Sequence, residues 1–534
     1  MAPNSKRRVP TRNKAAKLCQ HTDLTCTPSP HALNSGYHHY TQTQIHNAAT
    51  GNKKLRVSDG VQAFLEAFPS PLGLPRDDVT LDPKYPAQSK NAWMSLPERN
   101  AVTMRRSVIY VAAPPLIDDS IRMMREWSRP VVQGKALPKS QSQDSFDVNA
   151  VVDYLKAFYH GLEVRLLHAA LSFLAWNDEP TPKPGKSVRS TSHRNGKVEC
   201  VGLSTGKELI RIRVREAPIQ NVSSSANHFP YRYQLDLNDL TDAALSLLPA
   251  DAYSLLLTAE QDLYESVEDD FCCGRAWGAS RVAIVSSARY IPSLDPLHGV
   301  DTEHVWPASH CLDFVESMSL DQSDGSVPGA RGEGRTMKRC KTLPITDESV
   351  TTPTPLKRAV TAHQSTRRPT AADLQSMLLL RICRTASHEL GHCFGLDHCM
   401  YRACVMQATS SVAEDMRQPP YLCPVCDAKL AWAILNKASQ TQSGTKPMAK
   451  GRAKRKLDDI EIEGEEGRKW RKERLVATKE FCQGQGSGFA GLVAFSTGVL
   501  EFLERLDKAN MDASRRYHIG FSDGSKRDES LSFD

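Results

Sequence analysis

Two kinds of hydrophobic pattern follow one another between residues 99 and 300 of the chain. Apolar side chains recur at helical spacing over residues 117–127, 151–159 and 237–248, with Asn238 as the expected N-cap of the last of these helices. Residues 107–113, 163–167, 209–214, 252–258 and 278–286 instead run apolar or alternate with a period of two, which is typical of strands. Helices and strands that follow one another predict an α/β (α+β) domain with a mixed, twisted sheet.

Three other stretches lack this periodicity. Residues 1–95 are rich in Ser, Thr, Asn, Pro and basic residues, and they are expected to be largely disordered apart from a short helical pattern at 61–68. Residues 301–369 are expected to be a flexible insertion, rich in Gly, Pro and Thr from 311 onward. Residues 437–470 are expected to be a second, charged insertion, in which the basic run 450–456 precedes an acidic one.

The remaining parts complete the expected organisation. Residues 96–300 are expected to form the first part of the main folded domain. Residues 370–436 follow the insertion and open with a capping box of Thr370 and Asp373. C-terminal helices are expected over 471–510, and 511–534 is expected to be a mobile tail.

Composition constrains the compartment. The chain has 534 residues, a formal net charge of +7 and 14 cysteines. The N-terminus lacks the apolar core of a signal peptide, and no run of about 18 apolar residues predicts a membrane span. We therefore expect an intracellular, cytoplasmic protein whose thiols bind metal and do not pair, with a nuclear address at 450–456 as one interpretation. A solvated charge run, without nucleic acid, is the favoured interpretation of that segment.

The strongest chemical signal is the sequence His388-Glu-Leu-Gly-His-Cys-Phe-Gly-Leu-Asp-His398. In a helix, His388 and His392 lie one turn apart on the same face, and Gly395 is expected to end the helix so that His398 returns to the same ion. Glu389 is placed to hold a water molecule and take its proton. Three protein ligands and an open position are typical of catalytic zinc. An exposed helix that carries histidines by chance is the alternative, expected in roughly one chain in ten thousand for the full pattern.

Cysteines follow directly. Cys399 and Cys404 come after His398, then Met406, and Cys423 and Cys426 follow after sixteen residues. Paired cysteines at these spacings suit a tetrahedral sulfur site for zinc, with four unrelated buried cysteines as the alternative.

This arrangement resembles the archaemetzincin (archaelysin) family, which combines an extended zinc helix with C-x4-C-x-M and C-x-x-C. The resemblance implies a metzincin-like fold, Met406 in the turn beneath a catalytic zinc, and a second zinc bound by the four thiolates, so that two Zn²⁺ ions are expected per chain. Asp262-Leu-Tyr264, Phe271-Cys-Cys-Gly274 and Ser286-Ser-Ala-Arg-Tyr290 strengthen it. By the same analogy, the strand through Val282 is expected to be the sheet edge to which substrate adds.

The resulting hypothesis is a zinc metallopeptidase that acts on a peptide or protein substrate. A zinc-bound water attacks the peptide carbonyl, and Glu389 is the general base. Ala408 occupies the position at which some metzincins carry an oxyanion-stabilising tyrosine, so that group is not assigned. His304 and His310 are interpreted as loop residues without a metal. The alternative is a non-enzymatic zinc-binding interaction protein that uses the basic insertions.

Overall fold

The computed structural model describes residues 19–53, 57–132, 135–136, 145–176, 193–194, 197–217, 229–320, 353–364, 369–436 and 464–522. Its α-helices are α1 Pro30–Ser35, α2 Gln42–Thr50, α3 Asp59–Glu66, α4 Asp78–Leu81, α5 Lys90–Met94, α6 Val148–Phe158, α7 Leu237–Leu247, α8 Leu312–Leu320, α9 Pro355–Gln364, α10 Ala371–Cys393, α11 Val412–Asp415, α12 Pro424–Leu435, α13 Glu465–Gln483 and α14 Ala490–Ser522. Short 3₁₀ turns include Asp119–Glu126, where a longer helix was expected.

A mixed five-stranded sheet is the centre of the fold. Its strands lie in the order β14 Gly274–Trp277, β15 Val282–Ser286, β12 Ala252–Ala259, β1 Val108–Ala112 and β5 Glu163–Leu166. All neighbours are parallel except β14, which runs antiparallel to β15. The expected α/β architecture with a mixed sheet is therefore confirmed.

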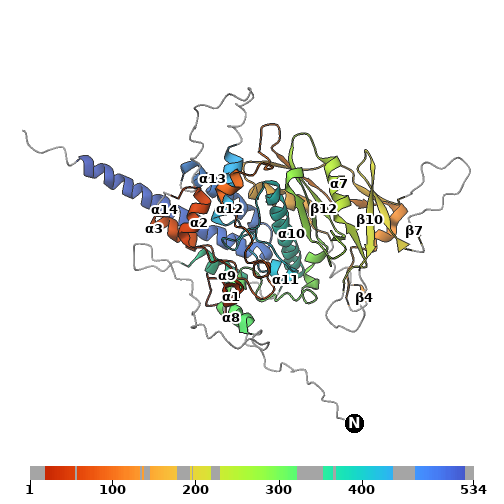
Figure 1. The fold of residues 1–534 in the computed structure, drawn as a ribbon, viewed down its shortest axis with the longest axis horizontal. Coiled ribbons are helices and arrows are strands. Elements are labelled where there is room, and N and C mark those ends of the chain that lie inside the picture. Colours follow the sequence, from red (N-terminus) through yellow and green to blue (C-terminus); the bar gives the residue numbers. More distant parts are fainter. Residues whose placement is uncertain are drawn as a thin grey trace, which may run out of the picture.

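Both faces of this sheet are buried, which explains why its central strands are continuously apolar. Successive side chains of a strand point to opposite faces. Leu256 and Val285 accordingly join the core under α10 and α6, whereas Leu255 and Ile284 join the core that contains α7. Figure 1 shows α10 along one side of β12, with α7 and the second sheet beyond it.

The second sheet has six strands in the order β13 Asp262–Tyr264, β11 Tyr233–Asp236, β10 Leu209–Glu216, β9 Cys200–Ser204, β6 Ser172–Leu174 and β2 Leu116–Ile117. Helix α7 packs between the two sheets, with contacts to both β10 and β15. It begins at Leu237, and its N-cap is Asp236, whose carboxylate accepts the backbone N–H groups of Asn238 and Asp239. The expected Asn238 cap is wrong, because a carboxylate two residues earlier already satisfies those donors.

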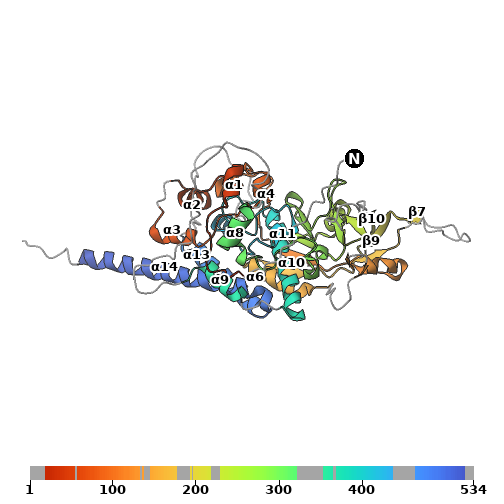
Figure 2. The same cartoon turned by 90° about the horizontal axis from the view of Figure 1, so that it is seen from below.

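The expectation of a largely disordered N-terminal region is wrong for the described residues between 19 and 94. They form helices α1–α5, and side chains such as Ile45, Phe64 and Trp93 are buried in the main core. The Ser and Thr residues that gave the segment a disordered composition serve in part as N-caps, at Ser29, Thr41, Ser58 and Ser89. In Figure 2, α1, α2 and α4 lie along one side of the molecule, and α9 and α14 along the opposite side.

The expected insertions are also shorter than the pattern indicated. Residues 301–320 and 353–364 are described as ordered structure, and α9 packs on α14, where Arg358 pairs with Glu501 at 2.6 Å. Helix α13 begins at Glu465, inside the expected 437–470 insertion, and the backbone of α14 continues to Ser522, inside the expected tail. A helix that packs on the core through few large apolar side chains shows only a weak apolar repeat in its sequence, so the sequence pattern does not reveal it. Residues 321–352 and 437–463 lie outside the described residues.

No helix within the described ranges combines the length and the apolar character that crossing a membrane requires.

Candidate metal centres

Helix α10 positions the first centre. It opens with the expected capping box, in which Thr370 and Asp373 exchange side-chain-to-backbone hydrogen bonds. Its buried face includes Leu378, Ile382 and Ala386, which pack in the main core beneath the sheet. The helix is thereby fixed at both its start and its apolar face, so that its C-terminal turns are held in place.

The helix ends where the sequence predicted. Gly395 has a positive φ of 75°, the left-handed conformation that glycine adopts without a steric penalty. The Gly395 N–H donates to the His392 carbonyl at 2.9 Å, and the Leu396 N–H donates to the Gly391 carbonyl at 3.2 Å. These two bonds are those of a Schellman motif, which reverses the chain and returns His398 toward the helix.

Three imidazoles converge at this turn. His388, His392 and His398 each place one ring nitrogen so that the three atoms lie within 4.8 Å of one another. The Nε2 atoms of His388 and His392 are 3.0 Å apart, and their Nδ1 atoms lie 2.6 and 2.8 Å from the backbone carbonyls of Val405 and Leu396. Since a carbonyl only accepts, Nδ1 carries the proton and Nε2 keeps its lone pair for a metal.

Electrostatics favours the neutral form that metal binding requires. Burial, reinforced by the neighbouring imidazoles, lowers the pKa of His388 well below its usual value and that of His392 to about 4. Burial likewise lowers the pKa of His398, although Asp397 and Asp78 oppose the shift. Three neutral imidazole nitrogens around one point are a donor set that suits Zn²⁺.

Glu389 lies at the floor of a cleft of about 830 Å³ that the three histidines also line. Burial raises its pKa to about 8, with Arg275 opposing the shift. The wall beside it is the backbone of β14, so close that a Cβ on Gly274 would lie 3.0 Å from Glu389 Oε1. Asp78 of α4 also lines the cleft; the sequence analysis missed it because no motif marks it.

The edge of the sheet differs from the expectation. The strand through Val282, β15, is internal, since β14 pairs with it on one side and β12 on the other. The edge strand is β14, and residues Gly274, Arg275 and Ala276 line the cleft. The antiparallel hairpin strand was not recognised because Gly274–Trp277 is short and has little apolar alternation.

The three short motifs upstream of α10 meet in space. Asp262 of β13 forms a buried bidentate ion pair with Arg289, at 2.8 and 2.6 Å, and the Arg289 guanidinium lies 4.1 Å from the Phe271 ring centre. The next residue, Tyr290, accepts a hydrogen bond of 2.8 Å from Thr385 on α10. This network therefore connects the β13–β15 region to α10.

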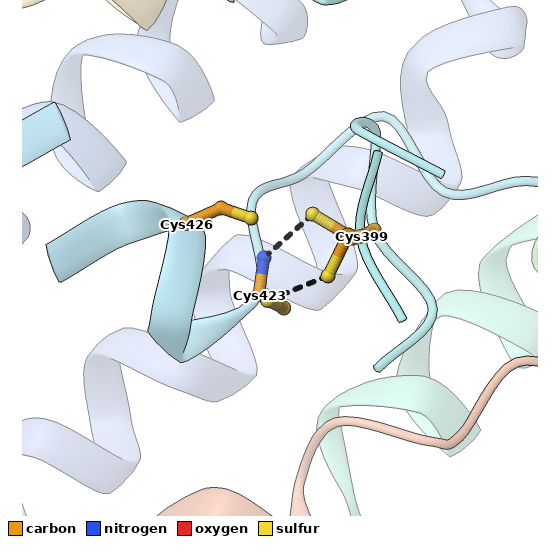
Figure 3. Close-up of side chains that lie close together, drawn as sticks. Cys399, Cys423 and Cys426 are labelled. Atoms are coloured by element: carbon orange, nitrogen blue, oxygen red, sulfur yellow. Dashed lines mark hydrogen bonds between the residues drawn. The ribbon is translucent and has the colours of Figure 1, made fainter. Parts of the chain in front are cut away.

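The second group consists of Cys399, Cys404, Cys423 and Cys426, whose sulfurs all lie within 4.8 Å of one another. All four are buried. The sulfurs of Cys399 and Cys423 are 3.5 Å apart, and Cys404 Sγ accepts the Cys423 N–H at 3.2 Å. Figure 3 shows Cys399, from the loop after α10, facing Cys423 and Cys426 at the start of α12. Four clustered, free thiols are a donor set that suits tetrahedral zinc.

The segment between the two groups contacts both. Met406 is fully buried, and a Cβ on Gly391 of α10 would lie 2.5 Å from its sulfur, so Met406 packs directly against α10. Its neighbour Val405 accepts the His388 hydrogen bond, and Cys404 belongs to the thiolate group.

Among the described cysteines Cys26 is disulfide-bonded, and the others are not in disulfides. The expectation that the thiols do not pair is therefore wrong at this residue. The spacing of the cysteines did not predict a disulfide at Cys26, because the fold and not the distance along the sequence decides which cysteines pair.

Comparison with known sequences tests the resemblance to the archaemetzincins. Residues 363–432 match the model of Peptidase family M54. Archaemetzincin-2 of Homo sapiens is 48% identical over 62 residues, 12% of this chain and 17% of that protein. Archaemetzincin of Thermococcus kodakarensis is 44% identical over 54 residues, 10% of this chain and 29% of that protein. The resemblance to the archaemetzincins is thus confirmed over a short region, and residues 363–432 contain every candidate ligand of both groups.

These relatives are matched over less than a third of their own length. A crystal structure of archaemetzincin from Methanopyrus kandleri aligns with 63% of this chain and 97% of its own, with a TM-score of 0.26 and 14% identity.

Proposed function

We propose that this chain is a zinc-dependent metallopeptidase of the archaemetzincin type, with His388, His392 and His398 as the ligands of a catalytic zinc. The observation that carries the proposal is the convergence of the three imidazoles beside a buried glutamate in one cleft. The match to Peptidase family M54 over 363–432 supports the same class of activity.

When bound, the zinc supplies Lewis acidity, which lowers the pKa of a water molecule and polarises a peptide carbonyl. The residues of the chain supply the rest. Glu389 accepts the proton of the attacking water and donates it to the leaving amine, a role that suits its position among the three ligands. Its buried surroundings hold the carboxyl group in one place beside the reacting atoms.

We further propose that the substrate binds as an added strand on β14. As the edge of the five-stranded sheet, β14 pairs with β15 alone, and its residues line the cleft beside Glu389. An extended peptide that pairs with a sheet edge gains backbone hydrogen bonds without requiring particular side chains. A peptide bound in this way would lie beside His388, His392 and His398, which line the same cleft.

We also propose a second, structural zinc on Cys399, Cys404, Cys423 and Cys426. Closed four-thiolate sites leave no open position for substrate, so this ion would stabilise the fold around Met406 without taking part in the reaction.

Glu389→Ala tests the mechanism. The variant keeps all three imidazoles, so zinc content and melting temperature should match wild type, while cleavage of a peptide library should fall by about a hundredfold or more for want of the base. Glu480→Ala, at an exposed position of α13, is the matched control and should cleave at the wild-type rate. Undiminished cleavage by Glu389→Ala would reject the mechanism. The non-enzymatic alternative predicts instead that the zinc-loaded wild type cleaves nothing.

A further inference from the structure

A third cluster of sulfur and nitrogen atoms lies apart from the two centres described above. Cys19, His304 and Cys311 each place one possible ligand atom so that the three lie within 4.8 Å of one another. Across the described ranges, groups of three or more Cys, His, Asp or Glu side chains meet this condition in three places only, and the other two are the centres already described. The cluster therefore has the same local geometry as the two candidate zinc sites.

Backbone pairing brings the three residues together. Residues 23–25 run antiparallel to 310–312, with a bridge between Leu24 and Cys311 and hydrogen bonds of 2.9 Å in both directions. The Cys19 N–H also donates to Glu303 Oε1 at 2.8 Å, which holds the start of the segment beside the loop that carries His304. The contact is thus part of an ordered strand pairing.

The sulfur geometry suits a shared ion. Neither Cys19 nor Cys311 is in a disulfide, and their sulfurs are 3.2 Å apart. Two zinc–sulfur bonds of about 2.3 Å at a tetrahedral angle would separate the sulfurs by about 3.8 Å. A small outward movement of the two side chains would therefore accommodate the metal, and Cys19, which is half-buried, has room to make it.

The imidazole of His304 is oriented as a ligand would be. Its Nδ1 lies 2.8 Å from the Asp301 carboxylate, and its ring stacks on Phe314 with 4.2 Å between ring centres. The other nitrogen, Nε2, is buried, and the imidazole interacts with the side chains of both Cys19 and Cys311. A carboxylate on one ring nitrogen with the other directed at a metal is the usual arrangement of a zinc-binding histidine.

We propose that Cys19, His304 and Cys311 bind a further zinc ion, with water as the fourth ligand. Two thiolates and one imidazole are donors that prefer zinc over magnesium or calcium. The ion would join the N-terminal segment to the loop that precedes α8. This assignment revises the interpretation of His304 as a loop residue without a metal. Sequence spacing could not indicate it, because Cys19 and Cys311 are 292 positions apart.

The test is the zinc content of the full-length, folded chain, purified with a reductant and without chelator. Wild type should contain one zinc ion more than Cys19→Ser, and one more than His304→Asn. Cys200→Ser is the matched control, since Cys200 is a buried thiol outside all three groups, and its zinc content should equal that of wild type. Cys19→Ser exchanges one sulfur for oxygen at a half-buried position, so little packing is lost.

Affinity provides a second readout. Asp301→Asn keeps all three ligands but weakens the orientation of His304, so a competing chelator should remove one zinc at about 10–100-fold lower concentration than from wild type. Unchanged zinc content in Cys19→Ser and His304→Asn overturns the proposal. So does a linked Cys19–Cys311 peptide pair in a non-reducing digest of protein purified in parallel without reductant, because it would show a disulfide between the two proposed ligands. Neither outcome depends on peptidase activity. The His388→Ala/His392→Ala variant lacks the proposed catalytic ligands, and it should still bind the zinc ion at Cys19, His304 and Cys311.

Discussion

Gly274 and Glu389 lie in direct contact, the backbone of the edge strand against the carboxylate of the proposed base. A Cβ on Gly274 would be 3.0 Å from Glu389 Oε1 and 3.1 Å from its Cγ. No side chain larger than hydrogen fits there without displacing the carboxylate, so the position of Glu389 depends on a glycine in β14.

Gly274→Ala should therefore lower peptide turnover, by about tenfold, because the Glu389 carboxylate must give way by a few tenths of an ångström and proton transfer depends on its position. Zinc content and melting temperature should change little. Gly484→Ala is the control, since a Cβ there would meet its nearest neighbour at an ordinary 3.7 Å. Equal turnover of Gly274→Ala and wild type would show that Glu389 is not held as proposed.

Cys423→Ala should destabilise the fold together with the loss of one zinc. Structural zinc commonly contributes on the order of 10 kcal/mol, which is comparable to the stability of a whole domain. We expect a lower melting temperature, faster proteolysis of residues 399–435 and a fall in activity. Cys482→Ala, at a buried cysteine outside the ligand groups, should keep its zinc and lose only packing energy. Full zinc content in Cys423→Ala would contradict the four-thiolate site.

Arg289→Met should reduce the free energy of unfolding by about 3–5 kcal/mol, because it leaves the buried Asp262 carboxylate without its partner. Chemical denaturation would measure the change. Lys156→Met provides the comparison: this lysine is 52% exposed and its partner Asp153 is 57% exposed, so its loss should cost less than about 1 kcal/mol. Similar values for the two variants would show that the Arg289 pair is not buried as described.

Acid should destabilise the protein in part through His298. Burial, with Arg289 and Arg381 nearby, lowers its folded-state pKa to about 4, below the value of about 6.5 in an unfolded chain. Between these two values the unfolded state binds a proton that the folded state does not, so stability falls as the pH falls. The slope attributable to His298 is at most about 1.4 kcal/mol per pH unit.

The measurement is urea denaturation of wild type and His298→Asn at several pH values from 7 to 5. The variant should lose stability less steeply on acidification, and His38→Asn, at an exposed position, should follow wild type. Parallel curves for His298→Asn and wild type would contradict the assignment.

The sequence predicted best where local chemistry dictates geometry. The turn at Gly395 requires a left-handed residue, and the capping box of Thr370 follows from three positions, so both are readable without a structure. The strands of the five-stranded sheet were recognisable because burial on both faces leaves continuous apolar runs such as β12. Their order in the sheet was not, and Val282 was placed at an edge that belongs to β14.

The N-terminal region failed for a related reason. Its apolar residues are few, and their burial depends on surfaces that appear only after the rest of the chain has folded, as where Tyr37 donates to the Met400 carbonyl at 2.7 Å or Trp93 Nε1 to the Phe394 carbonyl at 2.9 Å. Composition describes a segment alone, whereas these contacts join residues more than three hundred positions apart. The same limit hid the approach of Cys19 to Cys311.

The short segment Cys404-Val405-Met406 couples the binding of the two proposed zinc ions. Cys404 belongs to one ligand group, and the carbonyl of Val405 orients His388 in the other at 2.6 Å. An ion that orders this segment reduces the conformational entropy cost of binding the other ion. This coupling free energy is the same whichever ion binds first. Zinc at the thiolates should then tighten zinc at the imidazoles by the same factor as the reverse, so the two sites would fill cooperatively and not independently.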